Sequence, residues 1–197
     1  DIQGLAVRDA TPITGERFPL VIVSHGFLNT AGVLSGLTEN LATKGYVVVA
    51  IDHNDFGEES DTAVHIFARV MLNRSLDQQR IVEEFVQLAQ DSSSAIGAII
   101  DPESIGIAGF SMGGYGVLNH AGAGYNPEGS AYKYVPGDLL ETQSEANAAF
   151  KATTRDHISA AIAFAPWGAQ PETNMWTDSA LANIKAPLLV IGGSKDD

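Results

Sequence analysis

The hydrophobic pattern of this chain alternates between short apolar runs and longer stretches with helical spacing. Apolar runs of strand length recur at residues 18–24, 46–51, 104–110, 158–165 and 187–192. Runs with so few polar residues are typical of strands buried on both faces. Their alternation with helical stretches predicts an α/β fold, in which helices cover both faces of a mostly parallel sheet.

Two helices are expected between these strands. Leu34, Leu37 and Leu41 share one face of a helix over residues 31–44. A capping box at 75–78 predicts the start of a second helix, which should end near residues 91–94. The apolar stripe of this second helix consists of Val82, Phe85, Val86 and Ala89.

Residues 121–157 interrupt this alternation. The stretch is rich in Gly, Pro, Asn, Tyr and Ser, and no helical period returns before residues 141–150. Irregular segments of this length are commonly functional or mobile. No repeat and no sharp change of composition marks a second domain, so we expect one α/β domain over residues 1–197 with an irregular insertion at 121–157.

The charge and the cysteine count narrow the class of protein. Eleven Lys and Arg residues against 24 Asp and Glu residues give a net charge of −13, which argues against a nucleic-acid binder. The absence of cysteine excludes disulfides and thiolate chemistry. No apolar run reaches membrane-spanning length, and the first residues lack a signal-peptide pattern. The acidity suits a secreted or periplasmic protein but also fits a cytoplasmic one, and the oligomeric state stays open.

An acidic segment follows the second predicted strand. It contains Asp52, Asp55, Glu58, Glu59 and Asp61. Their spacing does not match a calcium-binding loop, so we expect a solvated loop. Because no His and Asp cluster has ligand spacing either, neither a metal nor another cofactor is expected.

The strongest chemical signal is Gly-Phe-Ser-Met-Gly at residues 109–113. It follows an apolar strand and precedes a helix-capable stretch, which is the context of a nucleophile elbow. Glycines on both sides would let the chain turn sharply enough to expose a serine hydroxyl. The sequence therefore predicts Ser111 as a nucleophile; the alternative is a glycine-rich turn without chemistry.

Three segments, at residues 23–27, 109–114 and 187–196, together resemble the α/β-hydrolase superfamily. Within it, the chain resembles bacterial relatives of dienelactone hydrolase and platelet-activating factor acetylhydrolase in three runs, Phe18 to Gly26, Leu41 to His53 and Arg74 to Arg80. Dienelactone hydrolases use a cysteine nucleophile, whereas this chain has Ser111. The Ser-Met-Gly-Gly and Pro-Trp segments also resemble cutinase-like polyester hydrolases.

The resemblance implies roles for further residues. It assigns the oxyanion hole to the backbone N–H groups of Phe27 and Met112, and a loop-ordering role to His25. The acid would be Asp196, with Asp197 as the adjacent alternative, because the segment after the fourth strand, Ala165-Pro166-Trp167, offers no carboxylate. Phe27 and Trp167 follow strand ends, so they are expected either to line the substrate pocket or simply to pack.

The catalytic histidine is not evident. The superfamily order is Ser, acid, His, so the base is expected beyond residue 197, after one more strand. The superfamily's first strands would likewise precede the sequence. The remaining histidines are interpreted as structural; they are His53, His65, His120 and His157.

These inferences predict a cofactor-independent serine carboxylic-ester hydrolase that acts on a small or polymeric ester. The acyl and alcohol specificity stays open. Two alternatives remain: an acyltransferase that uses the same groups, and a binding module of the same fold without catalysis.

Overall fold

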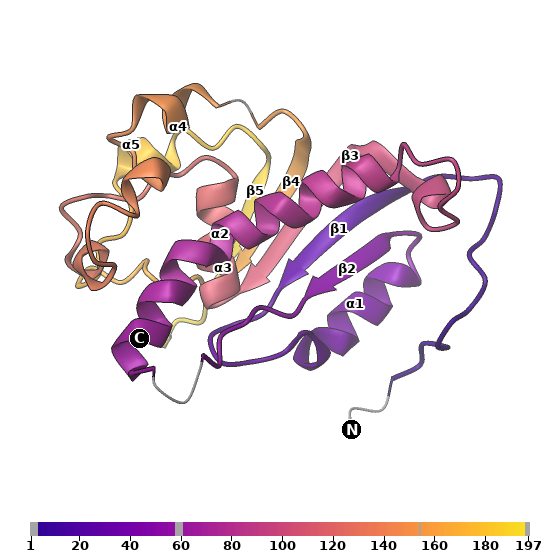
Figure 1. The fold of residues 1–197 in the computed structure, drawn as a ribbon, viewed down its shortest axis with the longest axis horizontal. Helices are drawn as coiled ribbons and strands as arrows, with labels where there is room; N and C mark the ends of the chain where they lie inside the picture. The colour runs from indigo at the N-terminus through magenta and orange to yellow at the C-terminus, as the bar shows by residue number, and fades with distance from the viewer. Residues whose placement is uncertain (1–3, 58–60, 154, 196–197) are drawn as a thin grey trace.

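The predicted α/β fold is confirmed by a computed structural model, which describes residues 4–57, 61–153 and 155–195. Five parallel strands form one sheet in the order β2-β1-β3-β4-β5 (Figure 1). The strands are β1 Phe18–Ser24, β2 Val47–Ile51, β3 Ile100–Phe110, β4 Ile158–Phe164 and β5 Leu188–Ile191. Each lies within two residues of a predicted apolar run, except that β3 begins four residues early.

The carboxyl ends of the strands are aligned at one edge of the sheet. Ser24 at the end of β1 is in register with Gly109 of β3, and Phe110 at the end of β3 is in register with Phe164 of β4. Phe164 is in turn in register with Ile191 of β5. The loops after β1, β3, β4 and β5 therefore meet at the edge where open α/β sheets bind ligands.

Helices cover both faces of the sheet. On one face, α1 Ser35–Ala42 follows a 3-10 turn at Ala31–Leu34, and Leu37 and Leu41 line a cavity together with strand residues such as Val21 and Ile162. On the other face, α2 Ala63–Leu88 runs over the sheet next to α3 Met112–His120 (Figure 1). Side chains alternate between the faces of a strand, so Ile105 and Ile107 join the core on this second face.

The predicted start of the second helix was wrong. Helix α2 begins 12 residues earlier, at Ala63, where Thr62 Oγ1 caps the helix by accepting the N–H of His65 at 3.2 Å. Ser75 and Gln78 instead lie inside the helix, buried, and Gln78 Nε2 donates to the carbonyl of Gly113 at 3.0 Å. The capping-box pattern thus lies in mid-helix, and Thr62, the true cap, has no Glu or Gln three residues later that would mark it in the sequence.

The irregular segment 121–157 contributes to the hydrophobic core. It forms 3-10 turns at Ser130–Tyr134 and Glu141–Gln143 and the short helix α4 Ala148–Ala152, and Tyr125 and Leu140 are fully buried. Asn119 on α3 holds the segment by donating to the carbonyls of Ala123 and Gln143, both at 3.0 Å. Buried amide hydrogen bonds thus replace regular secondary structure here. The remaining helix is α5 Asp178–Leu181.

Strand β5 exposes its apolar residues at the edge of the sheet. The side chains of Leu188 to Ile191 are between 38% and 52% exposed. Within the described ranges, no helix combines the length and the apolar character needed to cross a bilayer.

Candidate active site

Ser111 occupies the turn between β3 and α3 in a strained conformation. Its φ is 53° and its ψ is −114°, a region that residues other than glycine rarely adopt. The Ser111 N–H donates to the carbonyl of Phe164 at 2.9 Å, and this bond ties the turn to β4. The backbone therefore has the form of a nucleophile elbow.

Two glycines make this turn possible by close backbone approach. A Cβ atom at Gly109 would overlap the backbone of Gly113, and a Cβ atom at Gly113 would overlap the carbonyl oxygen of Ser24. Helix α3 can thus begin directly above the end of β1 and β3. The consequence is that Ser111 lies at the carboxyl edge of the sheet.

Ser111 opens into a cleft of about 810 Å³ at this edge. The cleft is also lined by Trp167, after β4, and by Gly192, after β5. The Trp167 N–H donates to the carbonyl of Ser111 at 3.1 Å, so the backbone of the tryptophan loop is anchored to the elbow. Ser111 and Trp167, two residues singled out in the sequence, thus share one cleft.

The two expected oxyanion donors lie next to Ser111. Met112 is the first residue of α3, so its N–H has no acceptor within the helix, and its side chain is buried in the core. On the other side, a Cβ atom at Gly26 would lie 3.4 Å from Ser111 Cβ. Phe27 directly follows this contact. The backbone next to both expected donors is therefore close to Ser111.

Backbone strain recurs in the loops around this site. Leu28 after β1 has a φ of 50°, and Ala165 after β4 has a φ of 41°, in addition to Ser111 after β3. Conformations of this kind cost of the order of 1–3 kcal/mol each and are concentrated at functional sites. The strain supports a functional role for this edge of the sheet.

An aromatic cluster lies beside the serine. Phe67 on α2 is at its centre, with ring centroids 5.4 Å from Phe27, 5.1 Å from Trp167 and 5.9 Å from Tyr134, all edge to face. Sequence reasoning identified Phe27 and Trp167 but missed Phe67 and Tyr134. Because α2 was expected to begin only at residue 75, Phe67 could not be assigned to a helix face.

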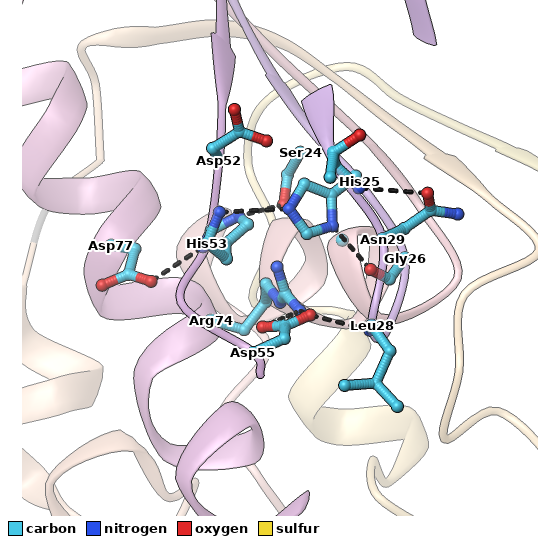
Figure 2. A network of polar contacts seen from close by, with 12 residues as sticks. Ser24, His25, Gly26, Leu28, Asn29, Asp52, His53, Asp55, Arg74 and Asp77 are labelled. Carbon is cyan, nitrogen blue, oxygen red and sulfur yellow. Dashed lines mark hydrogen bonds and ion pairs between the residues drawn. The ribbon is translucent and has the colours of Figure 1, made fainter. Parts of the chain in front are cut away.

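The expectation of a solvated acidic loop was wrong for Asp55. Its carboxylate is buried, accepts two hydrogen bonds from Arg74 Nη2 at 2.7 and 2.9 Å, and accepts the N–H of Leu28 at 2.9 Å (Figure 2). Burial lowers the pKa of Arg74, and the nearby Asp55 opposes that shift. Arg74 lies 19 residues away in the sequence, so the loop composition gave no sign of this pair. Glu58 and Glu59 of this loop lie outside the described residues.

Asp55→Ala should destabilise the folded protein by about 3–5 kcal/mol, because it leaves the Arg74 charge buried without its partner. Urea unfolding followed by circular dichroism measures the change. The matched control is Glu84→Ala, which breaks the exposed Arg80–Glu84 pair at 3.9 Å and should cost less than about 0.5 kcal/mol. Equal costs for the two variants would contradict this account of the buried pair.

The described histidines are engaged elsewhere or lie away from the elbow. His25 Nδ1 contacts the carbonyl of Gly26 at 2.6 Å, in agreement with the loop-ordering role that the resemblance implied. His53 is buried between Ser24 and Asp77. His120 ends α3, where burial lowers its pKa to about 3, and His157 precedes β4 at the opposite edge of the sheet. His65, in the first turn of α2, is exposed.

Asp196, the expected acid, and Asp197 lie outside the described residues. In the ranges that are described, no three His, Asp or Glu side chains converge as a metal site would require. The roles of Ser111, Asp196, Phe27 and Met112 remain predictions.

Comparison with known proteins agrees with this architecture. The chain is 25% identical to cutinase est2 of Thermobifida alba over 94% of the chain and 44% of that protein, and 24% identical to cutinase cut1 of Thermobifida fusca over 94% and 41%. A platelet-activating factor acetylhydrolase of Cavia porcellus is 39% identical over 27% of the chain and 12% of its own length. The chain thus spans about half the length of the cutinases that it matches.

A family model described as PET hydrolase-like matches residues 8–131, which include β1, the acidic loop, α2 and the Ser111 elbow. The match covers more than half of the chain, and the resemblance to serine esterases of the α/β-hydrolase superfamily is confirmed. The chain belongs to the PET hydrolase-like family.

Proposed function

We propose that the protein hydrolyses carboxylic esters through an acyl-enzyme formed on Ser111. The observation that carries this proposal is the strained serine at the elbow, which opens into the cleft at the carboxyl edge of the sheet. A serine in this position can meet an ester carbonyl without movement of the backbone. The curated relatives named cutinase and acetylhydrolase support the same reaction class.

In the first half of the reaction, Ser111 Oγ forms a bond to the ester carbonyl carbon, and its proton passes to a base. The carbonyl oxygen becomes an oxyanion that accepts the N–H groups of Phe27 and Met112. Collapse of the tetrahedral intermediate breaks the bond to the alcohol oxygen, which takes the proton. Water then repeats these steps on the acyl-enzyme and releases the acid.

We assign the base to a histidine outside these 197 residues, oriented by Asp196. A serine hydroxyl needs an adjacent base at neutral pH, and both ring nitrogens of His25 and of His53 already have partners.

An exported location of the protein fits its acidic composition. Fractionation of the source cells tests that location.

The test of the proposed function is pre-steady-state turnover of p-nitrophenyl butyrate by the full-length protein. An acyl-enzyme predicts a burst of nitrophenol of about one equivalent per protein, followed by slower steady release. Added alcohols distinguish hydrolysis from the acyltransferase alternative, in which butyrate esters of the alcohol would dominate the products. Failure to release nitrophenol would favour the binding-module alternative and overturn the proposal.

The aromatic cluster supports an aromatic or long acyl substrate. Phe67→Ala removes the ring that packs against both Phe27 and Trp167, and one such aromatic pair contributes about 0.5–1.5 kcal/mol. We expect KM for a benzoate ester to rise about tenfold, while KM for an acetate ester changes less than about threefold. Steady-state kinetics with both esters measures this, and Phe56→Ala, at an exposed phenylalanine outside the cluster, is the control. Equal changes for the two esters would contradict a specificity role.

A further inference from the structure

A second Ser–His–Asp array lies next to the candidate site and does not include Ser111. Ser24 Oγ and His53 Nε2 are 2.8 Å apart, and His53 Nδ1 and Asp77 Oδ2 are 2.7 Å apart (Figure 2). Its members come from the end of β1, the loop after β2 and the middle of α2. Neither this array nor its connection to the oxyanion loop was evident in the sequence.

This array is not a second catalytic triad. Ser24 is fully buried at the end of β1, so its hydroxyl cannot reach a substrate. The carboxylate of Asp77 only accepts hydrogen bonds, so His53 Nδ1 carries the proton. Burial lowers the pKa of His53, which favours the neutral ring, and Nε2 then accepts the hydroxyl of Ser24. The array therefore fixes the orientation and the tautomer of His53.

His53 is connected through its backbone to the oxyanion loop. The His53 N–H donates to His25 Nε2 at 3.1 Å, so His25 must carry its proton on Nδ1, which donates to the carbonyl of Gly26 at 2.6 Å. The rings of His25 and His53 also pack edge to face, with centroids 5.1 Å apart. Each of these contacts limits the rotation of the His25 ring.

The Gly26 carbonyl determines the direction of the expected oxyanion donor. The carbonyl of Gly26 and the N–H of Phe27 belong to one planar trans peptide and point in opposite directions. A hydrogen bond that holds the carbonyl therefore also holds the N–H. This is the bond that His25 makes.

Leu28, which follows Phe27, is held by α2, the helix that carries Asp77. The Leu28 N–H donates to Asp55, which Arg74 binds, so α2 anchors the loop through Arg74 and Asp77 (Figure 2). These two residues are three apart on α2 and share one face of the helix. Leu28 keeps its positive φ between these fixed points.

We propose that His53 and Asp77 are positioning residues, which act through His25 and the Gly26 carbonyl to aim the Phe27 N–H at the oxyanion. The proposal rests on the proposed function, because it assigns Phe27 to the oxyanion hole. It adds a reason for the array: prearranged donors stabilise a developing charge without reorienting during the reaction.

The test uses Asp77 variants of the full-length protein, because the Asp77 side chain is 42% exposed and its truncation leaves the core intact. Asp77→Ala should lower kcat for p-nitrophenyl butyrate about tenfold and leave KM within about twofold, since a misdirected donor affects the transition state more than substrate binding. Asp77→Asn keeps an acceptor oxygen for His53 and should lose no more than about threefold. Arg80 lines the same cavity as His53 and Asp77 but has no part in the array. Arg80→Ala is therefore the matched control and should have the kcat and KM of the parent.

A double-mutant cycle tests whether the array acts through Phe27. In a Phe27→Pro background, where the donor is absent, Asp77→Ala should change kcat less than about twofold further. A kcat of Asp77→Ala within twofold of the parent, or an undiminished effect in the Phe27→Pro background, would overturn the proposal.

A measurement that does not need turnover separates this proposal from the proposed function. Nitrogen-15 NMR of the imidazole rings should show the neutral Nδ1–H tautomer for both His25 and His53, with hydrogen-bonded ring protons. Asp77→Ala should remove the signal of the hydrogen-bonded Nδ1 proton of His53 and broaden the corresponding signal of His25. Unchanged signals would overturn the array, and the positioning role with it, even in an active enzyme. Missing ester turnover with the expected signals would leave the array in place and overturn the proposed function, together with the oxyanion role of Phe27.

Discussion

Ser111→Ala should lower ester turnover by about four orders of magnitude or more, while the protein stays folded. The hydroxyl forms the covalent bond to the acyl group, so no neighbouring group can replace it. Alanine retains the Cβ atom and leaves the N–H bond to the Phe164 carbonyl in place. Steady-state hydrolysis of p-nitrophenyl butyrate by the full-length protein measures the loss.

The control for this substitution is Ser93→Ala, at an exposed serine whose hydroxyl contacts Asp91 after α2. That variant should retain parental turnover. Thermal unfolding of both variants checks that the fold is retained. Turnover of Ser111→Ala within tenfold of the parent would exclude Ser111 as the nucleophile.

Phe27→Pro should reduce kcat by about a hundredfold or more, because proline has no N–H to donate to the oxyanion. Phe27→Ala keeps the N–H and removes only the ring that packs against Phe67. We therefore expect it to alter mainly the preference among esters, with kcat for a small acetate ester within about fivefold of the parent. The comparison separates the backbone of this residue from its side chain.

Urea unfolding first checks that Phe27→Pro and Phe27→Ala are both folded, and their kcat values are then compared. The N–H of Leu28 bound to Asp55 should hold the following part of the loop in both. Equal losses of kcat in the two folded variants would show that the side chain, and not the donor, carries the effect.

The strands were predictable because their apolar runs are short and nearly uninterrupted. The run from Phe18 to Ser24 matches β1 residue for residue, and the elbow around Ser111 was evident from its glycines. Both features depend on residues adjacent in the sequence. Local pattern was enough to predict them.

The start of α2 and the state of Asp55 were not predictable in the same way. The helix presents polar Arg74 and Gln78 to the protein interior, where partners distant in the sequence bind them. The start of α2 was misplaced because a capping-box pattern lies in mid-helix, whereas the true N-cap, Thr62, has no Glu or Gln three residues later. The contact of Phe67 was missed because this residue precedes the predicted start of the helix. The array through His53 was missed because its three members are distant in the sequence and meet only in the fold.

The most direct test of the central claim is labelling of the full-length protein with a fluorophosphonate, followed by peptide mapping. Only an activated serine reacts rapidly with this reagent, so the label should reach one equivalent and map to Ser111, with parallel loss of ester turnover. Ser111→Ala should remain unlabelled under the same conditions. A label on another serine, or full ester turnover after complete modification of Ser111, would contradict the account.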